Sequence, residues 1–352
     1  MAKKIKVGIL FGGRSAEHEV SLQSAKNIVD AIDKDKYEVL LIGIDKSGKW
    51  FLLEQSQFLI NEEDPKLIRL NTKKGKDVAI TPQSNGFIDK EVGDKVDVVF
   101  PILHGPFGED GTVQGLLKLA NIPFVGADVL GSAIGMDKDV MKRLLKEAGI
   151  PTANFLVFKK EDSIDFNEVV KKLNLPVFVK PANLGSSIGI SKARNRSDFN
   201  KAVKKAFSYN LKIIIEESII GREIECSVLG NEDPTASVLG EVIPNDDFYS
   251  YDAKYIDEDG AKFIVPADIS KEKTEEIQRL AIKTFKTLEC KGLGRIDFFL
   301  KEDGNIFVIE INTIPGFTKI SMYPHLWEES GISYTELIDQ LVQLALKRFN
   351  QR

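Results

Sequence analysis

An alternating pattern of hydrophobic and polar residues runs from residue 294 to residue 312 and is interrupted once, at Asp303-Gly304. This pattern predicts a β-hairpin closed by a two-residue turn. We expect helices at 271 to 288, before the hairpin, and at 335 to 348, after it. The hydrophobic face of the hairpin would consist of Ile296, Phe298, Leu300, Phe307, Ile309 and Ile311.

The opposite face of this hairpin carries an unusual pairing. With Asp303 and Gly304 as the turn, Asp297 lies opposite Glu310, and Arg295 lies opposite Asn312. Facing carboxylates lie roughly 5 Å apart and destabilise a sheet, so we expect a positive group between them. Two carboxylates and an amide suit Mg²⁺, which prefers oxygen ligands. The alternative is a solvated polar face.

Two continuous hydrophobic runs near the N-terminus, at 5 to 11 and 37 to 44, predict buried parallel strands. Residues at helical spacing lie between them, which completes a βαβ unit. Glu17 and His18 follow the Gly12-Gly13 turn that ends the first run. Strand ends and helix N-termini of such units collect polar ligands, so Glu17 is a candidate site residue. A structural turn with exposed side chains is the alternative.

The stretch from 97 to 111 is another hydrophobic strand, and it runs into a glycine-rich loop that carries His104, Glu109 and Asp110. If this strand joins the same sheet, His104 and Glu17 leave it at the same carboxyl edge, where ligands bind in such folds. A structural histidine is the alternative. Residues 46 to 90 are expected to form a less regular section with short strands.

The stretch from 175 to 190 predicts a strand that ends at Lys180-Pro181, a Gly- and Ser-rich loop, and a second strand that begins with Ile188 and Ile190. The spacing is not that of a Walker A motif, because the lysine precedes the glycines and the loop joins two strands. Lys180 and the backbone N–H groups around Ser186 and Ser187 can still bind phosphate oxygens. A plain hairpin loop is the alternative.

Between and beyond these signals lie a helix, a strand pair and a long connection. Asp137 is a good N-cap for an amphipathic helix at 138 to 148. Two strands are expected within 213 to 230, around Glu216 and Glu217, whose carboxylates could accept from an adenine amino group or ribose hydroxyls; a solvated pair is the alternative. Residues 244 to 266 contain three tyrosines and little periodicity, which favours a functional lid.

Size and composition exclude several classes of protein. The chain has 352 residues, enough for two or three domains, and 43% hydrophobic and 29% charged residues are ordinary for a globular protein. A net charge of -5, with Lys and Glu interleaved, gives no case for nucleic-acid binding. Neither a signal peptide nor a membrane span is evident. Cys226 and Cys290 form no CxxC motif, and we therefore expect a cytoplasmic protein.

Taken in order, these stretches resemble the ATP-grasp ligases and, within them, the D-alanine:D-alanine ligase family. The matching motifs are LFGGRSAEHEVS, LHGPFGEDG, MDK, VKPANLGSSIG, EESIIGREIE, YDAKY, GRID and EINTIPGFTKISMYP, which span residues 12 to 324. The resemblance implies an α/β fold in which a doubly wound-like N-terminal domain precedes a two-domain α+β ATP-grasp unit. The implied domains are 1–126 for substrate binding, 127–219 as the central ATP-grasp domain, and 220–352 with the lid and the metal site.

The resemblance also implies the roles of individual residues. Catalytic roles fall to Glu17, Ser186, Tyr255, Arg295 and Gly316, with Arg295 and the Gly316 N–H stabilising a tetrahedral intermediate and Tyr255 closing the lid with Ser186 and Glu17. Substrate would contact His104, Lys254, Ser321 and Met322. ATP would contact Lys138, Lys180, Ser187, Glu216, Ile219 and Glu223. Asp297, Glu310 and Asn312 would hold two Mg²⁺ ions, for which Mn²⁺ could substitute.

The activity implied is the ATP-dependent joining of two D-alanine molecules through an acyl phosphate, for peptidoglycan precursors, by a cytoplasmic homodimer. Ligases that join D-alanine to D-lactate or D-serine are an alternative, and a non-catalytic nucleotide-binding protein is another. Lys254-Tyr255 resembles the lid of dipeptide-forming members. Leu184 departs from the family, which often has a charged residue there, and this puts one side-chain contact to phosphate or metal in question.

Overall fold

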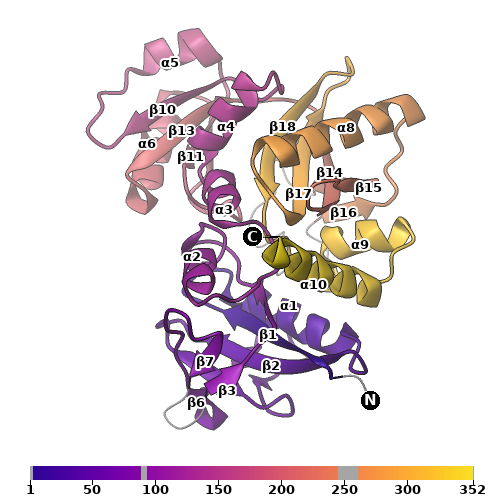
Figure 1. Ribbon diagram of the computed structural model, residues 1–352. Coiled ribbons are helices and arrows are strands. Elements are labelled where there is room, and N and C mark those ends of the chain that lie inside the picture. The colour runs from indigo at the N-terminus through magenta and orange to yellow at the C-terminus, as the bar shows by residue number, and fades with distance from the viewer. Residues whose placement is uncertain (1–2, 89–92, 245–260, 352) are drawn as a thin grey trace.

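The computed structural model describes residues 3–88, 93–244 and 261–351. Three sheets of four or five strands organise this part of the chain, and they form three lobes in Figure 1. The N-terminal lobe lies at the bottom of that view, and the other two lie side by side above it, with α4 between them. The predicted lid residues Lys254 and Tyr255 lie outside the described residues.

The N-terminal sheet has the strand order β6-β3-β2-β1-β9. Strand β1 pairs in parallel with both β2 and β9, which confirms the predicted βαβ unit and the shared carboxyl edge. The section from 46 to 90 contains short strands, as expected. The elements of this lobe are β1 (Ile5–Gly12), α1 (His18–Ala31), β2 (Tyr37–Ile44), β3 (Trp50–Leu53), β4 (Leu59–Ile60), β5 (Arg69–Leu70), η1 (Thr72–Lys74), β6 (Lys76–Asp77), β7 (Gly86–Ile88), β8 (Gly93–Lys95), β9 (Val98–Ile102) and α2 (Thr112–Leu119).

The central sheet has the order β10-β13-β11-β12, with every pairing antiparallel. Strand β11 ends at Pro181, as predicted, but the next strand begins at Ser191, so the expectation that Ile188 and Ile190 begin it was wrong. Those residues belong to the loop, which is tightened by turn hydrogen bonds from Ile188 and Ile190 N–H groups. The elements are β10 (Phe155–Lys159), α5 (Phe166–Leu173), β11 (Val177–Pro181), β12 (Ser191–Ala193), α6 (Arg196–Tyr209) and β13 (Lys212–Glu217).

The third sheet has the order β16-β15-β14-β17-β18 and packs on α8 and α4. Helix α4 begins where predicted, because the Asp137 side chain accepts the N–H groups of Asp139 and Val140. The elements of this region are α3 (Val129–Met136), α4 (Lys138–Glu147), β14 (Arg222–Gly230), β15 (Thr235–Pro244), β16 (Ala261–Ile264), α8 (Lys271–Thr287), β17 (Gly292–Leu300), β18 (Ile306–Asn312), α9 (Met322–Glu329) and α10 (Tyr334–Asn350).

The hairpin β17–β18 has the predicted pairing at its polar end and a different turn. Asp297 faces Glu310 and Arg295 faces Asn312, as expected. The predicted two-residue turn is wrong: Lys301 and Asn305 close a three-residue loop, with Gly304 at φ +82°. A β-bulge between Asp297 and Phe298 absorbs the additional residue and restores the pairing beyond it. The hydrophobic face is shifted accordingly, and the second strand buries Ile306, Val308 and Ile311.

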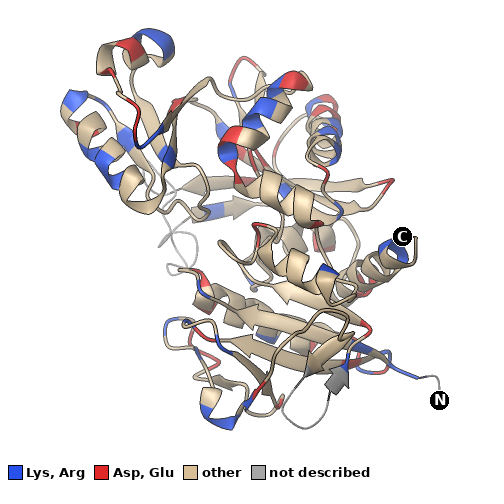
Figure 2. Ribbon diagram, turned by 60° about the vertical axis from the view of Figure 1, so that its left-hand side comes forward, with Lys and Arg blue, Asp and Glu red and all other residues tan. Residues whose placement is uncertain are grey.

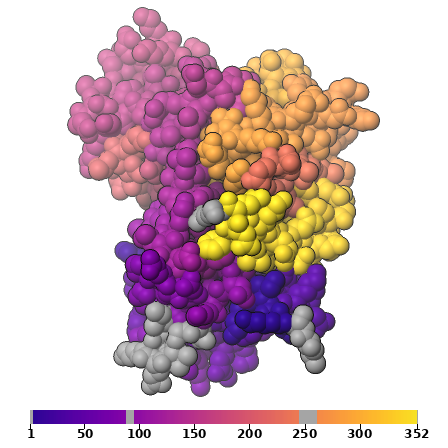
Figure 3. Space-filling model, in the orientation of Figure 1, coloured from indigo at the N-terminus to yellow at the C-terminus, as the bar shows by residue number. Residues whose placement is uncertain are grey.

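Helix α10 covers the N-terminal sheet although the two are far apart in the sequence. It starts with a capping box formed by Ser333 and Glu336. Its hydrophobic face belongs to the same core as β1, β9 and α1. Arg348 donates to the carbonyl oxygens of Phe124 and Gly126 at 2.8 and 2.6 Å. In Figure 3 this helix, in yellow, lies directly on the indigo and purple N-terminal lobe.

Charged residues of both signs are interspersed over all the lobes drawn in Figure 2. Among the helices of the described residues, none is both long enough and apolar enough to cross a membrane.

Candidate active site

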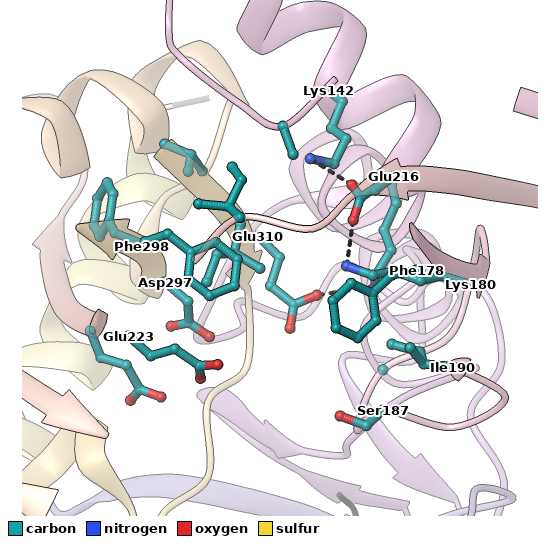
Figure 4. A pocket seen from close by; sticks show the side chains of 18 of the residues that line it. Lys142, Phe178, Lys180, Ser187, Ile190, Glu216, Glu223, Asp297, Phe298 and Glu310 are labelled. Carbon is teal, nitrogen blue, oxygen red and sulfur yellow. Dashed lines mark ion pairs between the residues drawn. The ribbon is translucent and has the colours of Figure 1, made fainter. Parts of the chain in front are cut away.

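A pocket opens between the central sheet and the third sheet, under the loop that follows β11 (Figure 4). It holds about 1000 Å³ of empty space, counting the part open to solvent. Predicted site residues that line it are Lys138, Lys180, Ser186, Ser187, Glu216, Ile219, Glu223, Asp297 and Glu310.

One wall of the pocket carries a row of carboxylates across three adjacent strands. Glu225 on β14 faces Asp297 on β17, and Asp297 faces Glu310 on β18. The side chain of Asn312 donates to Asp297 at 2.9 Å. We call Glu225, Asp297 and Glu310 the acidic row. Like charges placed this close on a sheet repel one another, so the row requires compensating cations.

In this structure the compensating cations are side chains of the protein. Arg295 donates to both oxygens of Asp297, at 2.7 and 2.8 Å, and lies 2.9 Å from Glu225. Lys138 Nζ lies 3.1 Å from Glu310. Within the described residues, no group of three or more His, Cys, Asp or Glu side chains is already assembled to hold a metal ion.

The opposite wall carries a buried triad of Lys180, Glu216 and Lys142, which we call the lysine triad. Glu216 forms an ion pair with Lys180 through one oxygen and with Lys142 through the other, at 2.7 Å. Figure 4 shows both lysines pointing at the Glu216 carboxylate. Burial alone would raise the pKa of Glu216, but Lys142 and Lys180 outweigh it and lower the pKa to about 2. Glu216 is therefore ionised.

The loop after β11 approaches the pocket in a strained conformation. Ser186 and Ser187 have φ angles of +50° and +59°, in the left-handed region that non-glycine residues avoid. Such a conformation costs on the order of 1–3 kcal/mol and persists where the surroundings enforce it, often at ligand sites. Lys138 donates to the carbonyl oxygen of Leu184 at 2.9 Å, which anchors the loop from below. Leu184 therefore contacts Lys138 through its backbone carbonyl oxygen.

Glu17 lies next to this loop, although it comes from the N-terminal sheet. The Ser186 hydroxyl donates to the Glu17 carboxylate. A Cβ atom at Gly105 would lie 2.7 Å from the other Glu17 oxygen, and the φ angle of Gly105 is +74°, so this position requires glycine. His18 does not lie next to this loop, because its ring forms a hydrogen bond with the Gly13 carbonyl oxygen at 2.8 Å.

His104 and Glu109 join the N-terminal loop to the segment after β18. His104 Nδ1 donates to the carbonyl oxygen of Ile314 at 3.0 Å, and Glu109 accepts the N–H groups of Ile314 and Gly105 at 3.1 and 2.7 Å. Burial lowers the pKa of His104 to about 4, so its ring is neutral. Loss of solvation and, after it, the Glu17 carboxylate raise the pKa of Glu109 to about 8.

The remaining predicted residues follow β18. A Cβ atom at Gly316 would lie 2.7 Å from Ser321 Oγ, so the two residues are in close contact. Ser321 Oγ accepts the N–H group of Thr318 at 2.9 Å. The Met322 side chain packs in a hydrophobic cluster with Val242 and Leu326. A contact between Met322 and substrate would therefore have to use its backbone.

Lys142 and Glu225 were missed from the sequence, and Glu109 was noted in its loop but given no role. Local spacing could have indicated the first two. Lys142 lies four residues after Lys138 on the same helix face. Glu225 lies two residues after Glu223, on the same side of β14. Glu109 stands in the motif HGPFGEDG, but only the fold brings it to Ile314.

Two family models match the chain, one after the other. The model described as D-ala D-ala ligase N-terminus matches residues 6–127, and the model described as D-ala D-ala ligase C-terminus matches residues 144–343. The chain belongs to the D-alanine–D-alanine ligase family. This confirms the family predicted from the motifs, and the ATP-grasp fold with it.

This ligase is similar along nearly its whole length to relatives named as D-alanine--D-alanine ligases. It is 56% identical to the D-alanine--D-alanine ligase of Shouchella clausii, over 99% of this chain and 96% of the relative. It is 52% identical to D-alanine--D-alanine ligase A of Escherichia coli K12, over 98% and 97%. Such ligases use ATP and a divalent metal ion.

Solved structures agree. The D-alanine-D-alanine ligase from Coxiella burnetii superposes with a TM-score of 0.88 at 38% identity, covering 99% of this chain and 96% of that one. The VanG D-Ala:D-Ser ligase from Enterococcus faecalis superposes with a TM-score of 0.84 at 36% identity, covering 97% and 100%.

Proposed function

We propose that this ligase joins two molecules of D-alanine into D-alanyl-D-alanine at the expense of ATP. A carboxylate is a poor electrophile, so the γ-phosphoryl group of ATP is first transferred to a carboxylate oxygen of the first D-alanine, and ADP leaves. The unprotonated amine of the second D-alanine then attacks the acyl carbon. The bond between that carbon and the phosphate oxygen breaks, and phosphate and one proton are released.

The observation that carries this proposal is that the acidic row and the lysine triad face each other across one pocket, with Lys138 beside Glu310. Phosphoryl transfer is catalysed mainly by positioning and by neutralising charge on the phosphates. Lys138 and Lys180 supply positive charge for the phosphates. Ser187 and the strained loop cover them, while Glu216, Ile219 and Glu223 lie where adenine and ribose would bind.

The donor set fits divalent cations. Among the described lining residues there are six carboxylates but only three lysines, so an anionic nucleotide would be repelled unless cations accompanied it. Asp297, Glu310 and Asn312 offer oxygen ligands of the kind that Mg²⁺ prefers. We infer two Mg²⁺ ions, replaceable by Mn²⁺, which would neutralise charge on the phosphates. Arg295 and Lys138 would then release the carboxylates they now pair with.

The amino acids would bind beside this pocket. Glu17 would hold the ammonium group of the first D-alanine, supported by Ser186, with His104 near its carboxylate. Ser321 and the backbone of Met322 would contact the second D-alanine. Arg295 and the N–H group of Gly316 would stabilise the oxyanion of the tetrahedral intermediate. Lys254 and Tyr255, which lie outside the described residues, are predicted to belong to a lid that excludes water and so protects the acyl phosphate.

The test is phosphate release by purified protein with ATP and Mg²⁺. D-alanine should stimulate release and L-alanine should not. Mass spectrometry of the products should show the dipeptide. If no amino acid stimulates phosphate release, the proposed activity is wrong.

A second candidate is the ligation of D-alanine to D-serine or D-lactate, and the similarity to the VanG D-Ala:D-Ser ligase favours D-serine. The two functions are distinguished by supplying D-alanine together with either compound and identifying the products by mass spectrometry. We expect the D-alanine dipeptide to predominate. A mixed product in excess would assign the second function instead.

We further propose that the dipeptide enters peptidoglycan precursor synthesis in the cytoplasm and that the ligase acts as a homodimer. Light scattering of the purified protein tests the dimer. A monomer at micromolar concentration would contradict it.

A further inference from the structure

Lys142 is a buried charged residue of the pocket that the proposed mechanism does not use. It lies on α4, one helical turn after Lys138, and its side chain is 2% exposed. Its ammonium group lies 2.7 Å from one oxygen of Glu216 and donates to the Thr152 hydroxyl at 2.6 Å. A buried ammonium group is costly to desolvate, so a lysine in this position needs a compensating purpose or partner.

The partner, Glu216, is shared. Its second oxygen is bound by Lys180, the lysine proposed to contact ATP. The lysine triad therefore contains two positive charges and one negative charge, so one positive charge is unbalanced within the triad, while Glu310 and Glu223 elsewhere in the pocket also attract Lys180. Phosphate oxygens that enter the pocket meet this surplus charge, and low dielectric surroundings strengthen the attraction.

We propose that Lys142 is a positioning residue for nucleotide binding: it neutralises Glu216 so that the charge of Lys180 is available to the phosphates. Without Lys142, Glu216 and Lys180 would form a closed neutral pair, and a phosphate would have to compete with Glu216 for Lys180. This inference rests on the proposed function, because it takes ATP as the ligand of the pocket.

The position of Lys142 also links the two walls of the pocket. The Thr152 hydroxyl accepts a hydrogen bond from the Lys142 ammonium group. The same hydroxyl donates a hydrogen bond to the carbonyl oxygen of Val308 at 3.0 Å. Val308 lies on β18, two residues before Glu310 of the acidic row. A continuous chain of polar contacts thus runs from Lys180 through Glu216, Lys142 and Thr152 to the strand that carries a proposed metal ligand.

A purely structural role predicts a different behaviour, and the structure offers a control for it. The ion pair of Lys142 with Glu216 joins α4 to β13. Lys212, also on β13, joins this strand to the start of α4 through ion pairs with Asp137 at 2.6 Å and Asp139 at 3.0 Å. Lys212 does not line the pocket. Removing Lys212 should loosen the same two elements without changing the charge that faces the nucleotide.

The test is calorimetric titration of the full-length protein with a non-hydrolysable ATP analogue and Mg²⁺. We expect K142M to weaken the affinity about tenfold, and K142Q, which keeps hydrogen-bonding groups but lacks the charge, to do the same. K212M should change it less than twofold. The KM for D-alanine should stay within twofold of wild type in all three variants. Either Lys142 variant binding like wild type would overturn the proposal.

A second background sharpens the test. In E216Q the negative charge that Lys142 neutralises is absent, so adding K142M there should cost less than threefold. An equal loss in both backgrounds would show that Lys142 does not act through Glu216. If the wild-type protein itself fails to bind the analogue, the proposed function is overturned with the inference. Normal wild-type binding with unaffected variants overturns the inference alone.

Discussion

The two walls of the pocket are built from the same kinds of residue in opposite proportion. The acidic row has three carboxylates served by Arg295 and Lys138, whereas the lysine triad has two lysines that share one carboxylate. A cation is attracted to the first wall and an anion to the second. This difference explains how one pocket can bind a nucleotide and metal ions together. The metal ions would bind at the negatively charged acidic row, and the phosphates at the positively charged lysine triad.

The largest effect is expected at Glu310, in the acidic row. Replacing it with Gln should lower turnover at least ~100-fold, since loss of even outer partners of a metal site costs ~10–100-fold. The Mg²⁺ concentration needed for half-maximal activity should also rise. A coupled ADP-release assay at several Mg²⁺ concentrations measures both. Glu302→Gln, on the exposed loop of the same hairpin, is the control; an active Glu310→Gln enzyme would refute the metal assignment.

On the other wall, Lys180→Met should raise the KM for ATP roughly 10- to 100-fold, because a hydrogen bond to a charged group contributes about 1.5–3 kcal/mol. The Mg²⁺ dependence at saturating ATP should remain that of wild type. Steady-state kinetics with ATP and Mg²⁺ varied separately distinguish the walls. If Lys180→Met shifts the Mg²⁺ dependence as strongly as Glu310→Gln, the division between the walls is wrong.

The amino-acid site should respond independently of both walls. Gly105→Ala would place a Cβ atom 2.7 Å from Glu17, and we expect it to raise the KM for D-alanine about tenfold, equivalent to ~1.4 kcal/mol. The KM for ATP should not change. Gly331→Ala is a matched control, because its φ of +89° imposes similar backbone strain but no atom lies within 4 Å of the added Cβ. If both variants raised the KM for D-alanine equally, the effect of Gly105→Ala would be due to backbone strain and not to contact with Glu17.

The smallest effect concerns Glu109 and pH. Its folded pKa of about 8 lies above the ordinary value of 4.5, so the folded protein retains a proton that the unfolded chain releases in this range. Stability contributed by this group is therefore present below about pH 4.5 and is lost as the pH rises to about 8. We therefore expect the Tm of Glu109→Gln, measured relative to that of wild type, to be higher at pH 8.5 than at pH 5. A constant difference in Tm would contradict the raised pKa.

Much of the fold followed from local patterns. Strands β1 and β2 are apolar except at Lys6 and Glu38, and α4 starts at an N-cap that is visible in the sequence. The facing of Asp297 and Glu310 was predicted correctly from an incorrect turn. A β-bulge compensated for the longer loop, and it left no local signal, because Phe307, Ile309 and Ile311 also alternate as a regular strand would.

The parts of the site that depend on packing between distant segments could not be predicted from the sequence. The motif resemblance named Lys180 and Glu216 as ATP-contacting residues, but only the packing of α4 against β13 brings Lys142 to Glu216. In the same way, Glu109 meets Ile314 because β9 and the segment after β18 lie together. Such contacts connect residues more than 70 positions apart, which periodicity and turn signals, being local, do not describe.

The docking of α10 on the N-terminal sheet has a consequence for how the protein is made. A ribosome adding about 5–20 residues per second needs roughly 10–40 s to proceed from residue 126 to the start of α10 at Tyr334. During that time the hydrophobic surface that α10 covers has no partner from its own chain. Newly synthesised N-terminal lobes are therefore exposed to aggregation and to chaperones until the final helix arrives.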